Sequence, residues 1–172
     1  MTSAADPLTL VLVGPMAAGK TSVGRRVARR LGVAFIDTDK RIVAAHGPIP
    51  AIFEDHGEAH FRALECAAVA EALSEGGVIS LGGGAVTEAA TRDLLAEHPV
   101  VFLTVSPDAV ADRLRGSNRP LLAGEDPLER WKKIFEERRG WYAEVSSATF
   151  DTSRRPMQKI ADEIVAWRRE QR

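Results

Sequence analysis

The residues best suited to chemistry lie near the amino terminus, where Gly14–Thr21 has the sequence GPMAAGKT and matches the spacing G-x-x-x-x-G-K-[ST]. A loop of this type turns its backbone N–H groups around a polyphosphate, with a helix amino terminus behind it. Lys20 is expected to bridge the β- and γ-phosphates, and the Thr21 hydroxyl to bind Mg²⁺. The loop follows an apolar run, Leu8–Val13, and opens an amphipathic helix, Lys20–Leu31, as such loops do. The segment therefore predicts a nucleotide-binding site.

Two carboxylates follow the second apolar run, in Asp37-Thr38-Asp39. The chain has no N/T-K-x-D motif of the GTPase type, and the third apolar run, Val78–Leu81, ends in glycines rather than an aspartate. A carboxylate that holds Mg²⁺ and its waters must come from elsewhere, and Asp37 is the candidate. Asp39 is the candidate to orient an acceptor hydroxyl and take its proton, because alternate residues of a strand end point the same way. The plainer interpretation is a solvated loop with a helix N-cap at Thr38 or Asp39.

Short apolar runs alternate with helical patterns along the chain, as in a sheet buried on both faces. The expected strands are Leu8–Val13, Val33–Ile36, Val78–Leu81, Val100–Val105 and, more weakly, Ala148–Phe150. The expected helices are Lys20–Leu31, Asp39–Ala45, Glu58–Ser74, Glu88–Glu97, Pro107–Leu114, Pro127–Glu144 and Met157–Arg169. This alternation predicts a three-layer α/β fold with five mostly parallel strands and helices on both faces. Gly14–Gly19 and Gly82–Gly84 then fall at carboxyl ends of strands, where ligands bind, and the polar stretch Arg115–Asp126 is expected to form a lid.

Composition and charge exclude several classes of protein. The 172 residues suit one domain, residues 1–172, and 23 Lys and Arg nearly balance 24 Asp and Glu, giving a net charge of −1. Nucleic-acid-binding and polybasic membrane-surface proteins normally carry a cationic excess, so neither nucleic acid nor membrane is an expected partner. The single cysteine, Cys66, cannot form an intrachain disulfide, which favours a reducing compartment. With no apolar run long enough to span a bilayer, we expect a cytoplasmic protein.

Six motifs, taken together in their order along the chain, resemble those of shikimate kinases, small P-loop kinases of the nucleoside-monophosphate-kinase-like group. They are the phosphate-binding loop, Asp37-Thr38-Asp39, Phe61-Arg62-x-x-Glu65, Gly82-Gly83-Gly84, Arg119-Pro120-Leu121-Leu122, and Arg138 four residues before Tyr142. The resemblance implies transfer of the γ-phosphoryl group of ATP to the 3-hydroxyl of shikimate, with Mg²⁺, a step towards aromatic amino acids. It also implies the strand order 2-3-1-4-5, a lid at about 115–126 and a substrate-binding helical segment at about 38–66.

The resemblance assigns roles to individual residues. Catalysis falls to Lys20, Asp39 and Arg119, the last being a lid cation that meets the charge developing between donor and acceptor. The residues assigned to ATP are Ala17, Ala18, Gly19, Lys20, Thr21, Ser22, Arg119 and Arg155. The residues assigned to shikimate are Asp39, Arg62, Gly83 and Arg138. The two arginines suit its carboxylate, because planar guanidinium groups pair bidentately with a carboxylate. The metal ligands are Thr21 and Asp37, and the expected state is a monomer with ATP and shikimate as its ligands.

Some assignments stay open on the sequence alone. Arg155 is expected at the adenine, opposite either Arg113 or Arg115. The family motif R-x-P-L-Y is replaced here by Arg138-Arg139-Gly140-Trp141-Tyr142, which makes Arg139 a rival to Arg138 and leaves open whether Trp141 reaches the substrate. In addition, Ala17 stands where the family often has glycine.

Other interpretations compete with this one. By spacing alone, Arg62 and Glu65 fit an ordinary exposed i, i+3 pair on a helix, worth ~0.3–0.5 kcal/mol. His56 and His60 have i, i+4 spacing but no third ligand at metal-site spacing, which favours a solvated helix end. The alternative functions are another small-metabolite kinase, such as a gluconate kinase, and a P-loop module that binds nucleotide without catalysis. The second alternative is disfavoured because the whole set of proposed catalytic residues is intact.

Overall fold

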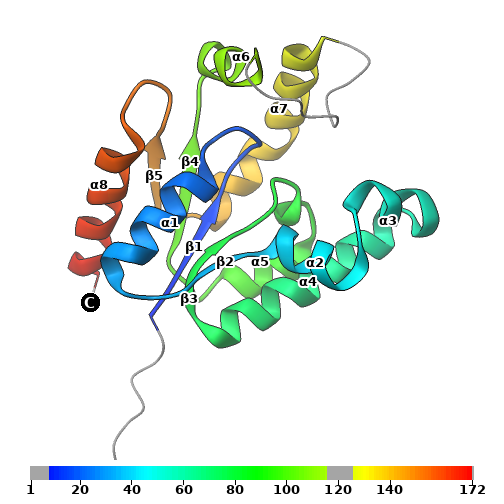
Figure 1. Ribbon diagram of the computed structural model, residues 1–172, viewed down its shortest axis with the longest axis horizontal. Helices are drawn as coiled ribbons and strands as arrows, with labels where there is room; N and C mark the ends of the chain where they lie inside the picture. Colours follow the sequence, from blue (N-terminus) through cyan, green and yellow to red (C-terminus); the bar gives the residue numbers. More distant parts are fainter. Residues whose placement is uncertain (1–7, 116–125, 172) are drawn as a thin grey trace, which may run out of the picture.

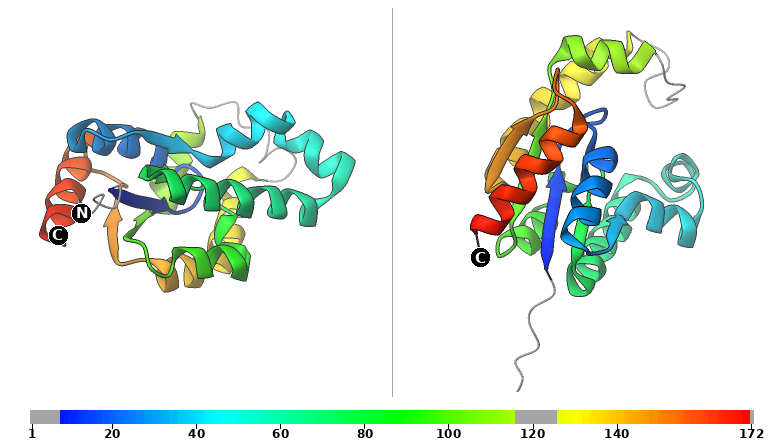
Figure 2. Two further views of the ribbon diagram at one scale, coloured as in Figure 1. Left: turned by 90° about the horizontal axis from the view of Figure 1, so that it is seen from below. Right: turned by 60° about the vertical axis from the view of Figure 1, so that its left-hand side comes forward.

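The computed structural model describes residues 8–115 and 126–171, in which a five-stranded parallel sheet carries helices on both faces (Figures 1 and 2). The strands are β1 (Thr9–Val13), β2 (Phe35–Asp37), β3 (Gly77–Ser80), β4 (Val100–Thr104) and β5 (Ala148–Asp151). The helices are α1 (Lys20–Leu31), α2 (Thr38–His46), α3 (Ile49–His56), α4 (Glu58–Glu75), α5 (Ala89–Leu95), α6 (Pro107–Arg115), α7 (Pro127–Val145) and α8 (Met157–Glu170), with a 3-10 turn, η1, at Ala85–Thr87. The sheet order is β2-β3-β1-β4-β5, so the expected order 2-3-1-4-5 is confirmed.

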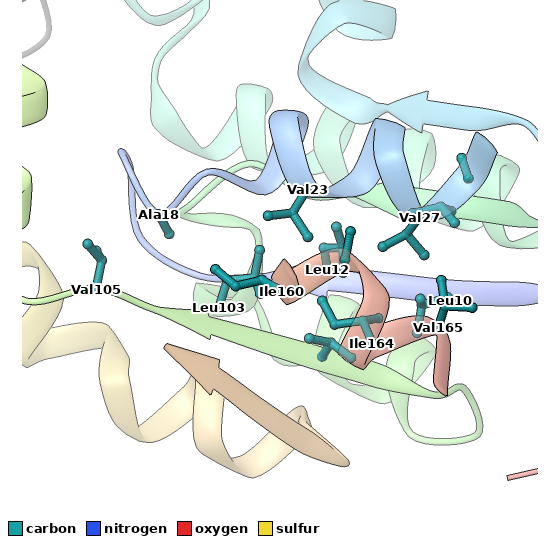
Figure 3. Packing of buried hydrophobic residues seen from close by; sticks show 14 of the residues in the cluster. Leu10, Leu12, Ala18, Val23, Val27, Leu103, Val105, Ile160, Ile164 and Val165 are labelled. Atoms are coloured by element: carbon teal, nitrogen blue, oxygen red, sulfur yellow. The ribbon is translucent and has the colours of Figure 1, made fainter. Parts of the chain in front are cut away.

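Strand β1 is apolar at every position from 10 to 13 because its two faces enter two different cores. Leu10 and Leu12 pack with residues of α1 and α8 on one face of the sheet (Figure 3). Val11 and Val13 pack with residues of α4, α5 and α7 on the other face. The central strand therefore holds the three layers together, and the loop that follows it starts from a rigid position.

Helices α2, α3 and α4 form a unit beside the sheet (Figure 1) with a small core of its own, in which Ile42, Ile52 and Phe61 are buried. The sequence pattern predicted α2 and α4 but gave no helix over residues 49–56. The prolines at 48 and 50 suggest a break, yet Pro50 lies in the first turn of α3, where the missing N–H costs nothing. The unit spans residues 38–75 and so contains the whole segment 38–66 that is expected to bind substrate.

The parallel register brings three strand ends to the same level. Ser80 of β3 is paired with Asp37 of β2 on one side and with Leu12 of β1 on the other. The segments that follow these strands, including Asp39 and Gly82–Gly84, therefore begin at one edge of the sheet.

Several element boundaries differ from the expected ones by one or two residues. The expected helix Glu88–Glu97 is shorter, at Ala89–Leu95, and the turn η1 precedes it. Of the expected lid, Arg115 ends α6 and Asp126 caps α7 by accepting a hydrogen bond from the Leu128 N–H. Residues 116–125, among them Arg119, lie outside the described part of the chain. Within that part, none of the helices is sufficiently long and apolar to cross a bilayer.

Candidate active site

The phosphate-binding loop joins β1 to α1, and two of its glycines are required by geometry. Gly14 has φ 151°, and a Cβ there would lie 2.4 Å from the carbonyl oxygen of Leu103. Gly19 has φ 88° and is the N-cap of α1. The Lys20 amine donates to the Gly14 carbonyl at 2.7 Å and to the Pro15 carbonyl at 3.0 Å, so it lies across the loop. The loop therefore has the backbone and the cation that a polyphosphate site needs.

At the end of β2, the turn is fixed from both sides. Asp37 is the N-cap of α2 and accepts from the Lys40 N–H at 3.2 Å. The buried Thr38 hydroxyl donates to the Ser80 carbonyl at 3.3 Å, which ties the turn to β3. The sequence left open an N-cap at Thr38 or Asp39, and the structure puts it at Asp37 instead.

Asp39 lies between the loop and α4. Its Oδ1 atom is buried and has no hydrogen-bond partner in the described part of the protein. Desolvation raises the pKa of this carboxyl and the charge of Asp37 raises it further, while Lys20 and Arg62 lower it. Asp39 is thus a hydrogen-bond acceptor held beside two cations, at the same edge as the phosphate-binding loop.

Arg62 and Glu65 form a buried ion pair on α4. Their exposed fractions are 8% and 1%, and Arg62 Nη1 donates to Glu65 Oε1 at 2.7 Å. Burial raises the pKa of Glu65 to about 7, against the opposing effect of Arg62 and Arg138. The interpretation as an ordinary exposed surface pair is therefore wrong. Burying an arginine beside a carboxyl group needs a reason other than stability, because the desolvation of the charged pair offsets much of its attraction.

The buried Glu65 carboxyl should make folding stability depend on pH. Its pKa rises from 4.5 to about 7 on folding, so between these values the folded protein binds a proton that the unfolded chain has released. This stabilisation is complete below pH 4.5 and is lost as the pH rises through about 7. Relative to Glu65→Gln, the wild-type Tm is expected to fall by roughly 5 °C or more across this range.

Thermal denaturation of both proteins at a series of pH values measures this difference. Glu71→Gln, at an exposed position of the same helix, is the matched control and should follow the wild-type curve. Parallel Tm curves for wild type and Glu65→Gln would contradict the prediction.

Helix α7 continues unbroken through Gly140, so loss of the family's proline does not distort it. The buried Tyr142 hydroxyl donates to the Gly83 carbonyl at 2.5 Å, and Arg138 makes a side-chain hydrogen bond with Tyr142. Burial raises the pKa of Tyr142 to about 12, and Arg138 opposes that rise. Arg138 also lowers the pKa of Glu65, so its guanidinium lies close to the buried Arg62–Glu65 pair of α4.

The neighbours of Arg138 on α7 turn elsewhere. Arg139 is exposed and pairs with Glu136 at 3.3 Å. The Trp141 ring packs against the Arg92 guanidinium, whose Cζ atom lies 5.4 Å from the centroid of the ring. Of the two rivals in the motif, the structure brings only Arg138 to the site.

The three consecutive glycines after β3 have different surroundings. A Cβ at Gly82 would lie 2.6 Å from Asp39 Oδ1, and one at Gly84 would lie 2.4 Å from Arg62 Nη2. A Cβ at Gly83 would meet nothing closer than 3.5 Å. Gly82 and Gly84 are thus glycines because side chains of the site occupy the space where their Cβ atoms would be.

A cavity of about 170 Å³ lies beside the loop, lined by Ala17, Gly19, Arg113, Leu114 and Met157. Arg113 is the arginine that lines it, whereas Arg115 is exposed and lies 3.4 Å from Asp112. Arg155, in the turn after β5, forms an ion pair with Glu163 of α8 and is not among the lining residues. Of the two candidates opposite Arg155, the structure places Arg113 at the loop.

Sequence reasoning missed two residues that contact the loop from outside. The Trp131 indole donates to the Met16 carbonyl at 2.8 Å, and the Thr152 hydroxyl donates to the Ala18 carbonyl at 2.7 Å. Neither belongs to a spacing pattern, so no signal in the sequence pointed to them. The rings of His56 and His60 lie 4.7 Å apart, and no group of three metal-binding side chains occurs in the ranges that the structure describes.

The sheet order, a glycine-rich loop closed by Lys20 and a buried set of carboxylates and arginines at the same edge define a small P-loop kinase. Residues 16–169 match the family model of shikimate kinase, and the chain belongs to the shikimate kinase family.

Individual relatives agree with the family. The shikimate kinase of Salinispora tropica is 51% identical over 159 residues, covering 91% of this chain and 95% of the relative. The structure of shikimate kinase from Acinetobacter baumannii in complex with shikimate has a TM-score of 0.88 at 36% identity, covering 96% of this chain and 95% of that one.

A gluconokinase from Sinorhizobium meliloti is less similar, with a TM-score of 0.65 and 25% identity over 96% of this chain and 94% of that one. The comparisons therefore favour shikimate kinase over the gluconate kinase alternative.

Proposed function

We propose that this chain transfers the γ-phosphoryl group of ATP to the 3-hydroxyl of shikimate in a Mg²⁺-dependent reaction. The observation that carries the proposal is the position of Asp39, a partly desolvated acceptor flanked by Lys20 of the phosphate-binding loop and Arg62 of α4. A carboxylate acceptor, a phosphate-binding cation and a carboxylate-binding cation therefore meet in one place. Shikimate is both a carboxylate and an alcohol, and a related kinase has been solved with it bound.

On the donor side, the loop amides and Lys20 hold the β- and γ-phosphates, with Ser22 and Thr21 in the first turn of α1 behind them. Ala17, Ala18 and Gly19 supply backbone around the phosphates. The cavity beside Arg113 is where we propose that the adenine lies, with Arg155 at the neighbouring turn. Arg119 is proposed to neutralise the transferring group, and its position lies outside the described residues.

The residues at the loop also fit a magnesium ion. Mg²⁺ usually takes one or two protein oxygens and completes its shell with water and substrate phosphates. Thr21 and Asp37 would supply two such oxygens, and the mutual repulsion of the Asp37 and Asp39 carboxylates supports a cation at this position. When bound, the ion would offset charge on the β- and γ-phosphate oxygens.

On the acceptor side, Asp39 accepts a hydrogen bond from the 3-hydroxyl and aims its oxygen at the γ-phosphorus. The new P–O bond forms as the bond from the γ-phosphorus to the β,γ-bridging oxygen breaks, and the electron pair leaves with ADP. The hydroxyl proton passes to the Asp39 carboxylate. Lys20 remains on the phosphates throughout and lowers the cost of their charge.

Arg62, Arg138 and the backbone of Gly83 bind shikimate in this proposal, with the two arginines at its carboxylate. Glu65 orients Arg62 through the 2.7 Å hydrogen bond, and Tyr142 links Arg138 to the Gly83 carbonyl. All of these residues come from one chain, which is consistent with an active monomer.

The proposal is tested by coupling ADP release to a spectrophotometric assay. Turnover is expected with shikimate and Mg²⁺, and it should fall to background when either is omitted. Gluconate, presented at the same concentration, should give no ADP above background. Turnover with gluconate but not with shikimate would replace the proposed substrate.

A further inference from the structure

Three consecutive carbonyl groups of the phosphate-binding loop, those of residues 16–18, each accept a hydrogen bond from a side chain of a different element. The donors are Trp131 of α7 at 2.8 Å, Arg113 of α6 at 2.6 Å and Thr152 after β5 at 2.7 Å, in that order. The side chains of Trp131 and Thr152 are buried, at 3% and 0% exposed, whereas Arg113 is half-buried and lines the cavity beside the loop. Loop carbonyls satisfied in this way are held from outside the loop.

Ala17, the middle residue of the three, has an unfavourable backbone conformation. Ala17 has φ 67°, and it is the one residue other than glycine with a positive φ in the described ranges. Alanine rarely adopts this left-handed conformation because its Cβ approaches the following carbonyl, whereas glycine adopts it freely. Such a residue persists only when the surrounding structure determines its geometry.

The hydrogen bonds to the Met16 and Ala17 carbonyls determine the geometry of Ala17. The φ and ψ angles of Ala17 follow from the orientations of the peptide groups before and after it. Trp131 holds the peptide before it through the Met16 carbonyl, and Arg113 holds the peptide after it through the Ala17 carbonyl. Two donors from two helices therefore fix both sides of the strained residue.

We propose that Trp131 and Arg113 are positioning residues for nucleotide binding, which keep Ala17 in the left-handed conformation that shapes the phosphate-binding loop. A glycine at this position would need no such support. The inference rests on the proposed function, because it takes the loop to be the site of the ATP phosphates.

Trp131→Phe tests the proposal because it removes the indole donor but keeps an aromatic ring to stack on Phe135, which lies 5.1 Å away. In the wild-type background, this change should weaken ADP binding about tenfold, the loss expected for one hydrogen bond and the conformation it supports. Shikimate affinity should not change. In an Ala17→Gly background, the same change should weaken ADP binding by no more than about twofold, because glycine adopts the left-handed conformation without strain. Titration calorimetry with ADP and with shikimate measures all four proteins.

Arg113→Met provides a second variant. Its affinity is measured for inorganic tripolyphosphate, because this probe has no base for an arginine to contact. The loss of affinity should again be several-fold larger in the wild-type background than in the Ala17→Gly background. A loss of charge alone would be equal in the two backgrounds. Trp167→Phe is the matched control, since Trp167 packs against the same core and should leave ADP affinity unchanged.

Two results would overturn the positioning role: unchanged ADP affinity in Trp131→Phe, or the same loss of affinity in the wild-type and Ala17→Gly backgrounds. These outcomes are separable from failure of the proposed function. If wild-type protein binds ADP but does not turn over shikimate, the proposed substrate is wrong and the positioning role is still measured.

Discussion

Asp39→Asn is expected to lower kcat by a factor of roughly 10² or more, while the dissociation constant for ADP changes less than about threefold. The amide has the shape of the carboxyl and keeps one acceptor oxygen, but it cannot take the hydroxyl proton. The phosphate-binding loop and Lys20 are untouched, so nucleotide binding should persist. Steady-state kinetics with saturating shikimate and titration with ADP measure the two effects separately.

The matched control is Asp55→Asn, which makes the same chemical change at an exposed position of α3. It should leave both kcat and ADP affinity at wild-type values. A near-normal kcat in Asp39→Asn would remove Asp39 from the proposed role, and a large loss of ADP affinity would show that Asp39 acts on the nucleotide instead.

The sequence predicted most of the fold because its periodic signals are strong. Strand β1 is apolar on both faces, and only a sheet covered by helices on both sides buries such a strand. Helix α3 escaped prediction because a proline near a helix start resembles a proline that breaks one. The distinction depends on the neighbouring helices α2 and α4, whose packing on α3 local sequence does not show.

The site was predictable only in part, for a different reason. Asp39, Arg62 and Glu65 occur in motifs, and the register of parallel strands explains how their segments meet. Burial is what separates Arg62 and Glu65 from a surface pair, and spacing does not reveal burial. Trp131 and Thr152 reach the loop from far along the chain, so their contacts exist only in three dimensions.

The three glycines after β3 should differ sharply when each is replaced by alanine. Gly82→Ala puts a Cβ 2.6 Å from Asp39 Oδ1, so it is expected to lower kcat by roughly 10². Gly84→Ala puts a Cβ 2.4 Å from Arg62 Nη2, so it is expected to raise the KM for shikimate by roughly 10². Gly83→Ala meets nothing closer than 3.5 Å and should change either constant by less than about tenfold.

The fold should tolerate all three changes, which makes the kinetic differences informative. None of these glycines has a positive φ, so alanine fits the backbone of each. At 82 and 84 the closest atoms are the ends of side chains, which move aside at the expense of the site rather than of the core. Gly83→Ala is therefore the comparison in which the added Cβ meets no clash, and thermal denaturation should give all three variants similar Tm values. Equal kinetic losses at all three positions would contradict the steric roles of Gly82 and Gly84, and would indicate that the backbone of the whole turn must approach the substrate.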